Sequence, residues 1–258
     1  MKKPLLIVGG VLGVVALAVV AIVVVQLLRS DDPNLATEAP LIAAPTTAAG
    51  ATSGGSPGTG ATGVEPTPSS NDGAAAEALP EGVREFVIVS AESEAKYVVR
   101  ESLRGLKTNA VGTTSAIDGS VFLTEGGLAD AGESSFRVDL STLKSDEGMR
   151  DNFIKQNTLQ TSRFQFAEFV IEDVSGFPAG YVEDTEVEMT ISGTLTIREV
   201  SKPVTWLVKV RQLGDTLTAV ADLTITFQDF GMSPPSVPIA TAEDEIQLQI
   251  VLVAREGA

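Results

Sequence analysis

Two serine and lysine pairs have a spacing that is known from nucleophilic catalysis. Ser93 and Lys96 match the pattern Ser-x-x-Lys of penicillin-recognising enzymes, as do Ser141 and Lys144, and Lys107-Thr108-Asn109 loosely matches their Lys-Thr-Gly. That chemistry requires the serine and the lysine one helical turn apart in a mainly helical domain. The first pair lies in a stretch with strand alternation and the second at the expected start of a helix. Neither pair therefore predicts an enzyme.

Acidic side chains are the other candidates for chemistry. Asp118, Asp139 and Asp229 could supply a general acid and base, but no spacing brings two of them together. Glu243-Asp244-Glu245 could attract a hard cation, although such runs are more commonly solvated surface charge. The chain has no His and no Cys, which excludes a Ser-His-Asp triad, a cysteine nucleophile, a disulfide and imidazole-bound metal. We predict no enzyme, no metal site and no cofactor.

The charge of the chain excludes one class of partner. The formal net charge is −16, and a chain this acidic repels nucleic acid. Residues 31–82 hold seven acidic residues and no Lys or Arg. The sequence carries no signal for an oligomeric state.

Apolar residues alternate with polar ones along most of the second half of the chain. In the stretch 187–210, Val187, Met189 and Ile191 begin one alternating run, and Val204, Trp206 and Val208 begin the next. This period of two predicts a hairpin of half-buried strands, with the turn or strand start at Lys202-Pro203 because proline cannot donate to a ladder. Similar runs lie at residues 86–89, 94–101, 110–123, 135–140, 159–171, 217–227 and 246–253.

One helix interrupts the strands. Met149, Phe153 and Ile154 recur near helical spacing after several potential N-cap residues at 141–146, which predicts a short helix near residues 146–156. Gly112 and Gly119 lie inside strand runs, where glycine marks the bends that a closing sheet requires. About eight amphipathic strands without a βαβ rhythm predict an all-β, antiparallel barrel or sandwich at residues 83–258.

The N-terminal region predicts a membrane anchor. Residues 5–28 are 24 positions without a formal charge, and as a helix they span about 36 Å at ~1.5 Å per residue, enough to cross a bilayer. Lys2 and Lys3 precede the run, so we expect residues 1–30 to place the N-terminus in the cytoplasm and the rest of the chain outside. The alternative is a signal peptide cleaved after Ala16-Leu17-Ala18.

A linker is predicted between the anchor and the β domain. In residues 31–82, 38 of the 52 residues are Ala, Gly, Pro, Ser or Thr. Such a segment has too little apolar surface to offset chain entropy, so we predict a disordered tether.

Several segments together resemble the YceI-like family of lipocalin-like, polyisoprenoid-binding envelope proteins. The most specific is Gly193-Thr-Leu-Thr-Ile-Arg-Glu-Val-Ser-Lys-Pro-Val, and Ala110-Val-Gly-Thr-Thr, Ser145-Asp-Glu-Gly-Met-Arg-Asp and Asp229-Phe-Gly-Met extend the likeness over residues 86–254. The resemblance implies an eight-stranded lipocalin-like barrel that encloses an apolar isoprenoid or quinone-like lipid. It also implies a place in the cell envelope.

Under this resemblance, the inward apolar residues would line a lipid tunnel. The candidate ligand-binding residues are Tyr97, Val99, Phe136, Val138, Phe153, Phe169, Leu195, Ile197, Trp206, Leu223, Ile225, Phe227, Phe230 and Met232. Arg150-Asp151 matches an Arg-Asp pair of the family, which we interpret as a structural ion pair or cap.

Two residues depart from the family pattern. Glu199 stands where a glycine commonly follows the arginine, and Phe227 where many members have a basic residue. These two departures favour a neutral ligand or a shorter pocket. Periodicity alone does not separate a hollow barrel from a filled one, so a membrane-tethered interaction module with a packed interior is the alternative function.

Overall fold

The computed structural model describes residues 35–41, 79–178 and 180–257. The predicted anchor at residues 5–28 lies outside these residues, and so does most of the predicted linker at residues 31–82. Among the described residues, no helix combines the length and the apolar character needed to cross a membrane. The compact unit that begins at Glu38 contains every described strand.

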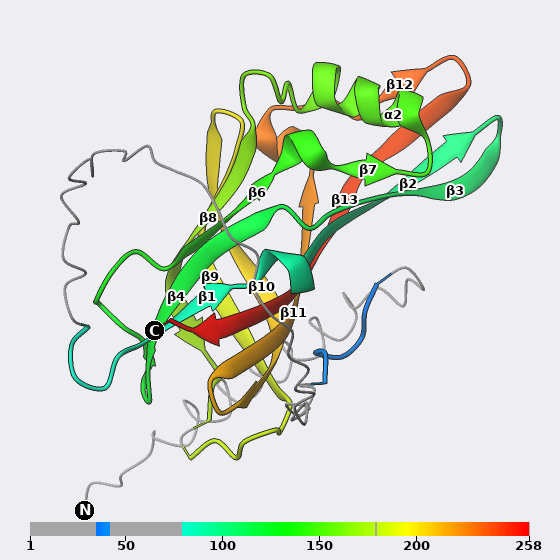
Figure 1. Ribbon diagram of the computed structural model, residues 1–258. Coiled ribbons are helices and arrows are strands. Elements are labelled where there is room, and N and C mark those ends of the chain that lie inside the picture. The colour runs from blue at the N-terminus through cyan, green and yellow to red at the C-terminus, as the bar shows by residue number, and fades with distance from the viewer. Residues whose placement is uncertain (1–34, 42–78, 179, 258) are drawn as a thin grey trace, which may run out of the picture. The chain divides into compact units, whose positions relative to one another are not determined.

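The described strands form one antiparallel sheet (Figure 1). The strands are β1 (Arg84–Ile88), β2 (Glu94–Leu103), β3 (Leu106–Thr114), β4 (Ile117–Thr124), β5 (Gly127–Leu128), β6 (Ser135–Asp139), β7 (Lys144–Ser145), β8 (Phe166–Ser175), β9 (Val187–Ile197), β10 (Val200–Leu213), β11 (Thr216–Thr226), β12 (Ser236–Val237) and β13 (Ala240–Glu256). The helical segments are η1 (Ser90–Glu92), η2 (Leu140–Thr142), α2 (Gly148–Phe153), the π-helical η3 (Ile154–Thr158) and η4 (Gln228–Phe230).

Eight of these strands close into a barrel. They neighbour one another in the order β1-β4-β6-β8-β9-β10-β11-β13, and the ring closes because β13 also pairs with β1, with Ile88 opposite Ala254. Because a closed ring has no unpaired edge, each member finds backbone partners on both sides over part of its length. The predicted all-β, eight-stranded barrel with one short helix is confirmed.

Strands β2, β3 and β7 extend the sheet beyond the ring. The long β13 pairs with β1 near its end and with β2 over Ala240–Val251, with an irregularity between Ala242 and Ile246. The β2–β3 hairpin, α2 and β12 consequently lie together at one end of the barrel (Figure 1). This end is called the helical end below.

The predicted helix at residues 146–156 is present as α2 and η3, but its cap differs from the prediction. The Glu147 carboxylate accepts a hydrogen bond from the backbone N–H of Met149 at 3.1 Å. Within residues 141–146, Ser141 is instead part of η2, where its N–H donates to Asp139.

The β9–β10 hairpin is present, but the predicted turn or strand start at Lys202-Pro203 is wrong, because β10 begins at Val200. The turn lies at Arg198-Glu199, where Arg198 takes the left-handed conformation with a φ of 57°. Pro203 lies inside β10 opposite Thr194. It is tolerated there because β10 pairs with β11 only from Leu207 onward, so no strand on that side requires the missing N–H.

Candidate functional site

The barrel is hollow toward the helical end. A cavity of about 690 Å³ lies there, bordered by strands of the ring, the β2–β3 hairpin and α2. Packed protein interiors contain few voids larger than one water molecule, which occupies about 30 Å³ of the liquid. Pockets for small molecules typically measure about 300–1,000 Å³. The cavity is therefore of the size of a ligand site rather than of a packing defect.

Most of the candidate ligand-binding residues line this cavity. The side chains that do so are Tyr97, Val99, Phe136, Val138, Phe153, Leu195, Ile197, Trp206, Ile225, Phe227 and Met232. The other three candidates are not among the lining residues. Phe169 and Phe230 are wholly buried, and Leu223 is half-buried against the core.

The opposite half of the barrel is filled by side chains. Trp206, Val208 and Val210 are the buried, inward residues of β10, but only Trp206 lines the cavity. On β13, Ile246 and Ile250 line the cavity, whereas Leu252 and Ala254 do not. The hollow therefore ends near the level of Trp206, and a barrel filled throughout, the alternative derived from the sequence, does not fit the structure.

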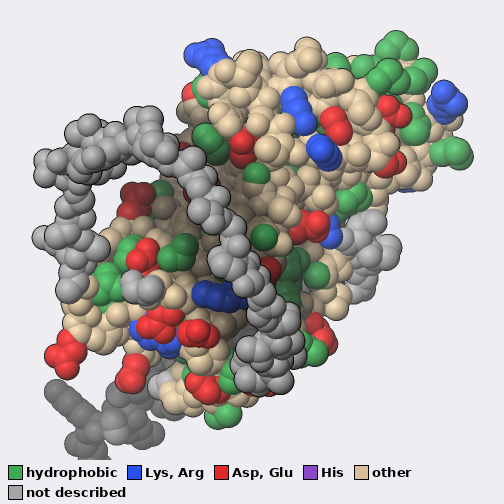
Figure 2. Space-filling view, in the orientation of Figure 1, with side chains coloured by type: hydrophobic (Ala, Val, Ile, Leu, Met, Phe, Trp, Pro, Cys, Tyr) green, Lys and Arg blue, Asp and Glu red, His purple; other side chains and the backbone are tan. Residues whose placement is uncertain are grey.

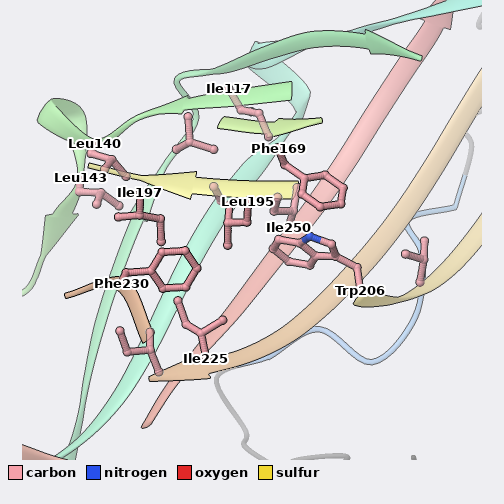
Figure 3. Close-up of a cluster of buried hydrophobic side chains, with 14 of the residues drawn as sticks. Ile117, Leu140, Leu143, Phe169, Leu195, Ile197, Trp206, Ile225, Phe230 and Ile250 are labelled. Atoms are coloured by element: carbon pink, nitrogen blue, oxygen red, sulfur yellow. The ribbon is translucent and has the colours of Figure 1, made fainter. Parts of the chain in front are cut away.

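Phe136 and Trp206 form an aromatic floor of the cavity, and the wholly buried Phe169 packs against both rings without lining the cavity. The ring centroids of Phe136 and Trp206 lie 6.1 Å apart, and those of Phe169 and Trp206 lie 6.0 Å apart, both in edge-to-face orientation. Figure 3 shows Phe169 and Trp206 together at one end of the buried cluster, away from Leu140 and Leu143. Edge-to-face rings pack favourably and hold one another in place. The floor is therefore an ordered aromatic surface.

Gly193 on β9 makes room for this aromatic group. A Cβ atom at residue 193 would overlap the carbonyl oxygen of Val170 and lie 2.9 Å from Cζ of Phe169. Because Gly193 has no side chain, β8 and β9 approach closely and the Phe169 ring packs against the backbone of residue 193. The glycine that begins the most specific family segment thus has a packing role.

Arg150 of α2 forms an ion pair at the wall of the cavity. The Arg150 guanidinium donates to the Glu101 carboxylate at 2.8 Å and to Asp146 at 2.6 Å, and only 18% of the Arg150 side chain and 10% of the Glu101 side chain are exposed. Burial would lower the pKa of Arg150, but the two carboxylates outweigh burial and hold that pKa above its usual value. Arg150 is therefore charged and engaged by protein partners.

Tyr97 brings a phenol into the same wall. Burial raises the pKa of Tyr97 to about 12, although the nearby Arg150 guanidinium opposes the increase. The phenol is consequently neutral at physiological pH and can donate or accept a hydrogen bond. Its ring faces Gly112, the residue opposite it on β3.

Asp151 anchors α2 rather than entering the cavity. Its carboxylate accepts hydrogen bonds from the backbone N–H of Ser145 at 3.0 Å and from the Ser145 hydroxyl at 2.6 Å. Together with the Arg150 ion pair, this contact fixes α2 across the helical end. The structural interpretation of Arg150-Asp151 agrees with these contacts.

Several other residues line the cavity that the sequence did not predict as ligand-binding. Ile246, Leu248 and Ile250 alternate along β13, and that signal could have placed them beside the other inward residues. Met149 on α2 and Leu103 at the end of β2 also line the cavity. No local pattern marks these two, because their position follows from how the hairpin and helix meet at the mouth.

Exposed apolar side chains surround the mouth. Of the nine large hydrophobic residues exposed among the described residues, five lie here: Leu103, Leu106, Met149, Val237 and Ile239. The backbone N–H of Arg104 donates to the Ile239 carbonyl at 2.8 Å, which joins the two hairpin tips. Figure 2 shows hydrophobic side chains gathered at the upper right, where Figure 1 draws these tips. These five residues are called the apolar rim below.

The groups considered for catalysis have structural partners. The Ser93 hydroxyl donates a hydrogen bond to the Val89 carbonyl at 2.9 Å, and the backbone N–H of Ser141 donates one to the Asp139 carboxylate at 2.8 Å. Asp118 pairs with Arg137 at 2.8 Å on the barrel surface.

Asp229 binds its own turn. It accepts hydrogen bonds from the N–H and the hydroxyl of Thr226 at 3.1 and 2.7 Å. These bonds hold the pKa of Asp229 below its usual value, because they favour the charged carboxylate. In the part of the chain that the structure describes, no group of three or more acidic side chains is arranged to hold a metal ion.

Solved structures with the same fold extend these observations. BcnA of Burkholderia cenocepacia is 21% identical, with a TM-score of 0.52 over 64% of this chain and 98% of that one. A polyisoprenoid-binding domain of Saccharophagus degradans, implicated in plant cell wall breakdown, is 14% identical, with a TM-score of 0.53 over 67% of this chain and 98% of that one. At such identities the likeness establishes the fold alone.

Family assignment rests on the sequence itself. No curated protein matches the chain. The YceI-like domain, in contrast, matches residues 86–254, from the middle of β1 to near the end of β13. This range is the one over which the hairpin and the other segments resemble that family. Because the match covers more than half of the chain and includes all or part of each of the eight ring strands, the protein belongs to the YceI-like family.

Proposed function

We propose that this protein binds an apolar isoprenoid-type lipid in its barrel, with the chain of the lipid in the cavity at the helical end. The cavity itself carries the proposal: its walls are mainly aliphatic and aromatic, and its volume of about 690 Å³ suits a small hydrocarbon guest. Binding would remove apolar surface from water, worth about 25 cal/mol per Å² before the costs of association. The polyisoprenoid-binding domain of Saccharophagus degradans, which has the same fold, supports this ligand class.

The proposed activity is binding and carriage without catalysis. The serines and carboxylates that could have supported chemistry bond to neighbouring protein groups, and none of them lies on the cavity floor. The Arg150 guanidinium of α2 is also paired, with the carboxylates of Glu101 and Asp146. A neutral lipid therefore fits this cavity better than an anionic one, which would have to compete for Arg150.

We infer further that the barrel acts at the outer face of the cell membrane. Two features support this location. The uncharged run at residues 5–28 is predicted to anchor the chain, with Lys2 and Lys3 on the cytoplasmic side. The apolar rim surrounds the mouth, where contact with a bilayer would let a lipid pass into the cavity without crossing water.

A mass measurement tests the ligand proposal. Residues 38–258 form the unit that carries the closed ring and its core, so they can be produced without the predicted anchor. Native mass spectra should show the chain together with an added apolar molecule, and an organic extract should contain an isoprenoid chain. The substitution Ala242→Phe, which fills part of the cavity wall, should reduce the bound fraction. A wild-type protein that remains bare after incubation with isoprenoid lipids would contradict the proposal.

A further inference from the structure

A tyrosine hydroxyl in the wall of the cavity has no hydrogen-bond partner among the described residues. Tyr97 lies between Ala95 and Val99 on the inward face of β2, and all three residues line the cavity. Ala95 and Val99 are buried, whereas Tyr97 is only partly buried. The side-chain atoms that are both enclosed by protein and unpaired belong to other residues. The Tyr97 hydroxyl is therefore accessible, and it opens into the cavity because the inward face of β2 borders the cavity.

The charged side chains near Tyr97 bond to one another. The Arg150 guanidinium donates to the Glu101 carboxylate at 2.8 Å and to the Asp146 carboxylate at 2.6 Å. The pKa of Tyr97 responds to the charges of Arg150 and Asp151, which both belong to α2. The phenol consequently lies on the side of the cavity that α2 covers, and its hydroxyl remains available to a guest.

Packing against Gly112 does not require a hydroxyl at residue 97. A Cβ atom at residue 112 would lie only 2.7 Å from the Tyr97 hydroxyl oxygen, so the absence of a side chain there gives the whole phenol its place against β3. A phenylalanine ring would cover the glycine in the same way. It would also avoid placing a polar group without a partner in a mainly apolar cavity, which is costly once a guest excludes water. The hydroxyl is thus a feature that packing leaves unused.

We propose that the bound lipid has a neutral head with a hydroxyl, ether or carbonyl oxygen, and that the Tyr97 hydroxyl donates a hydrogen bond to this oxygen beside α2. The apolar chain of the lipid then extends from α2 toward the aromatic floor. The head is neutral because Glu101 and Asp146 already balance the charge of Arg150, so an anionic head would lose its hydration without gaining a free cation. This inference rests on the proposed lipid binding and specifies the chemistry and the orientation of the ligand.

The two tyrosines of the chain give a direct readout. The unit of residues 38–258, freed of lipid and labelled with ¹³C at the tyrosine Cζ atoms, has one resonance from each ring. The probes are geranylgeraniol and the matched hydrocarbon in which a methyl group replaces the hydroxyl group. With the alcohol bound, Cζ of Tyr97 should resonate downfield of its position with the hydrocarbon bound. Tyr181 is the internal reference, because it does not line the cavity and its hydroxyl already donates to the Thr185 carbonyl at 2.6 Å.

The substitution Tyr97→Phe removes the hydroxyl and keeps the ring. It should weaken alcohol binding about tenfold, while hydrocarbon binding stays within about threefold because the aromatic surface is kept. Tyr181→Phe is the matched control, which assigns the two resonances and should leave both affinities unchanged. If Tyr97→Phe does not fold, the resonances of the wild-type unit still decide.

The possible outcomes separate this inference from the proposed function. Equal Cζ positions with alcohol and hydrocarbon, or an alcohol affinity that Tyr97→Phe does not change, would overturn the inference while leaving lipid binding intact. Tighter binding of geranylgeranyl phosphate than of geranylgeraniol would overturn the neutral head. Failure of all three probes to bind would overturn the proposed function and this inference together.

Discussion

The ring of Tyr97 lies over Gly112, and this contact shapes one wall of the cavity. The two residues are opposite each other on β2 and β3, and a Cβ atom at residue 112 would overlap the phenol ring at Cε1. The sequence pattern predicts a bend of the strand at Gly112. In the structure it lies in a regular register and provides room for an aromatic ring, a known way of covering glycine in a sheet.

Gly112→Ala should therefore disturb the cavity wall. The ring of Tyr97 must move, so we expect a loss of about 1–3 kcal/mol in the free energy of unfolding, measured by urea titration. Gly148→Ala on α2 is the matched control, since a Cβ atom there has open space. A Gly112→Ala protein as stable as the control would show that the Tyr97 ring adapts without cost.

Asp139 should make the stability of the barrel depend on pH. Burial would raise the pKa of this carboxyl, but hydrogen bonds from Ser141 and Gln165 outweigh burial and lower it below 3.8. Because the folded pKa is below the unfolded one, the stabilisation is complete above about pH 4 and is lost as the pH falls through the folded pKa.

Asp139→Ala tests this assignment. The loss of the bonds from Ser141 and Gln165 should cost about 1 kcal/mol at pH 7, and the difference from wild type should shrink in acid below about pH 3.8. Chemical denaturation at a series of pH values measures both quantities. Glu125→Ala, in the exposed turn between β4 and β5, is the control and should leave the stability at pH 7 unchanged. A difference that is constant down to pH 2 would refute the account.

The strands could be predicted from the sequence because pairing with a neighbouring strand does not change the two-residue alternation of inward and outward side chains. Val208 and Val210 face inward in β10 and Lys209 lies between them, as alternation requires. The turn of the β9–β10 hairpin was misplaced because Pro203 is a strong local signal, whereas its tolerance depends on where pairing with β11 begins, at Leu207. Local chemistry cannot reveal that register.

The extent of the cavity was also beyond the sequence. Leu195 and Val208 have the same inward alternation, yet Leu195 lines the hollow half and Val208 fills the packed half. Which half is hollow depends on how side chains from different strands meet at each level of the barrel. A period of two identifies the inward face but contains no information about this filling.

The apolar rim at the hairpin tips and α2 should mediate contact with membranes. The triple substitution Leu106→Glu, Met149→Glu and Ile239→Glu changes side chains that are 74%, 76% and 56% exposed, so the fold should be retained. We expect the partition of residues 38–258 onto phosphatidylcholine vesicles to fall about tenfold or more in a flotation assay. Val182→Glu, at a residue that is 69% exposed away from the rim, is the control. Equal losses in both proteins would mean that the rim has no special role.

Charged and apolar residues are distributed very unevenly along the chain. Residues 5–28 carry no formal charge, whereas the chain as a whole has a net charge of −16. A strongly acidic surface keeps a β domain soluble and weakens unspecific attraction to anionic lipid headgroups. The apolar rim and the predicted anchor are then the two features that would hold the cavity mouth at a bilayer.

The proposed anchor predicts how the full chain fractionates. The intact protein should remain with the membrane after alkaline carbonate washing, because a spanning helix is not released by disrupting ionic contacts, and deletion of residues 1–30 should release it. Protease added outside the cytoplasm should digest the barrel, since Lys2 and Lys3 favour a cytoplasmic N-terminus. The alternative of a cleaved signal peptide predicts a mature chain that begins at Val19. N-terminal sequencing of the membrane fraction distinguishes the two, because detection of Val19 as the first residue would exclude the uncleaved anchor.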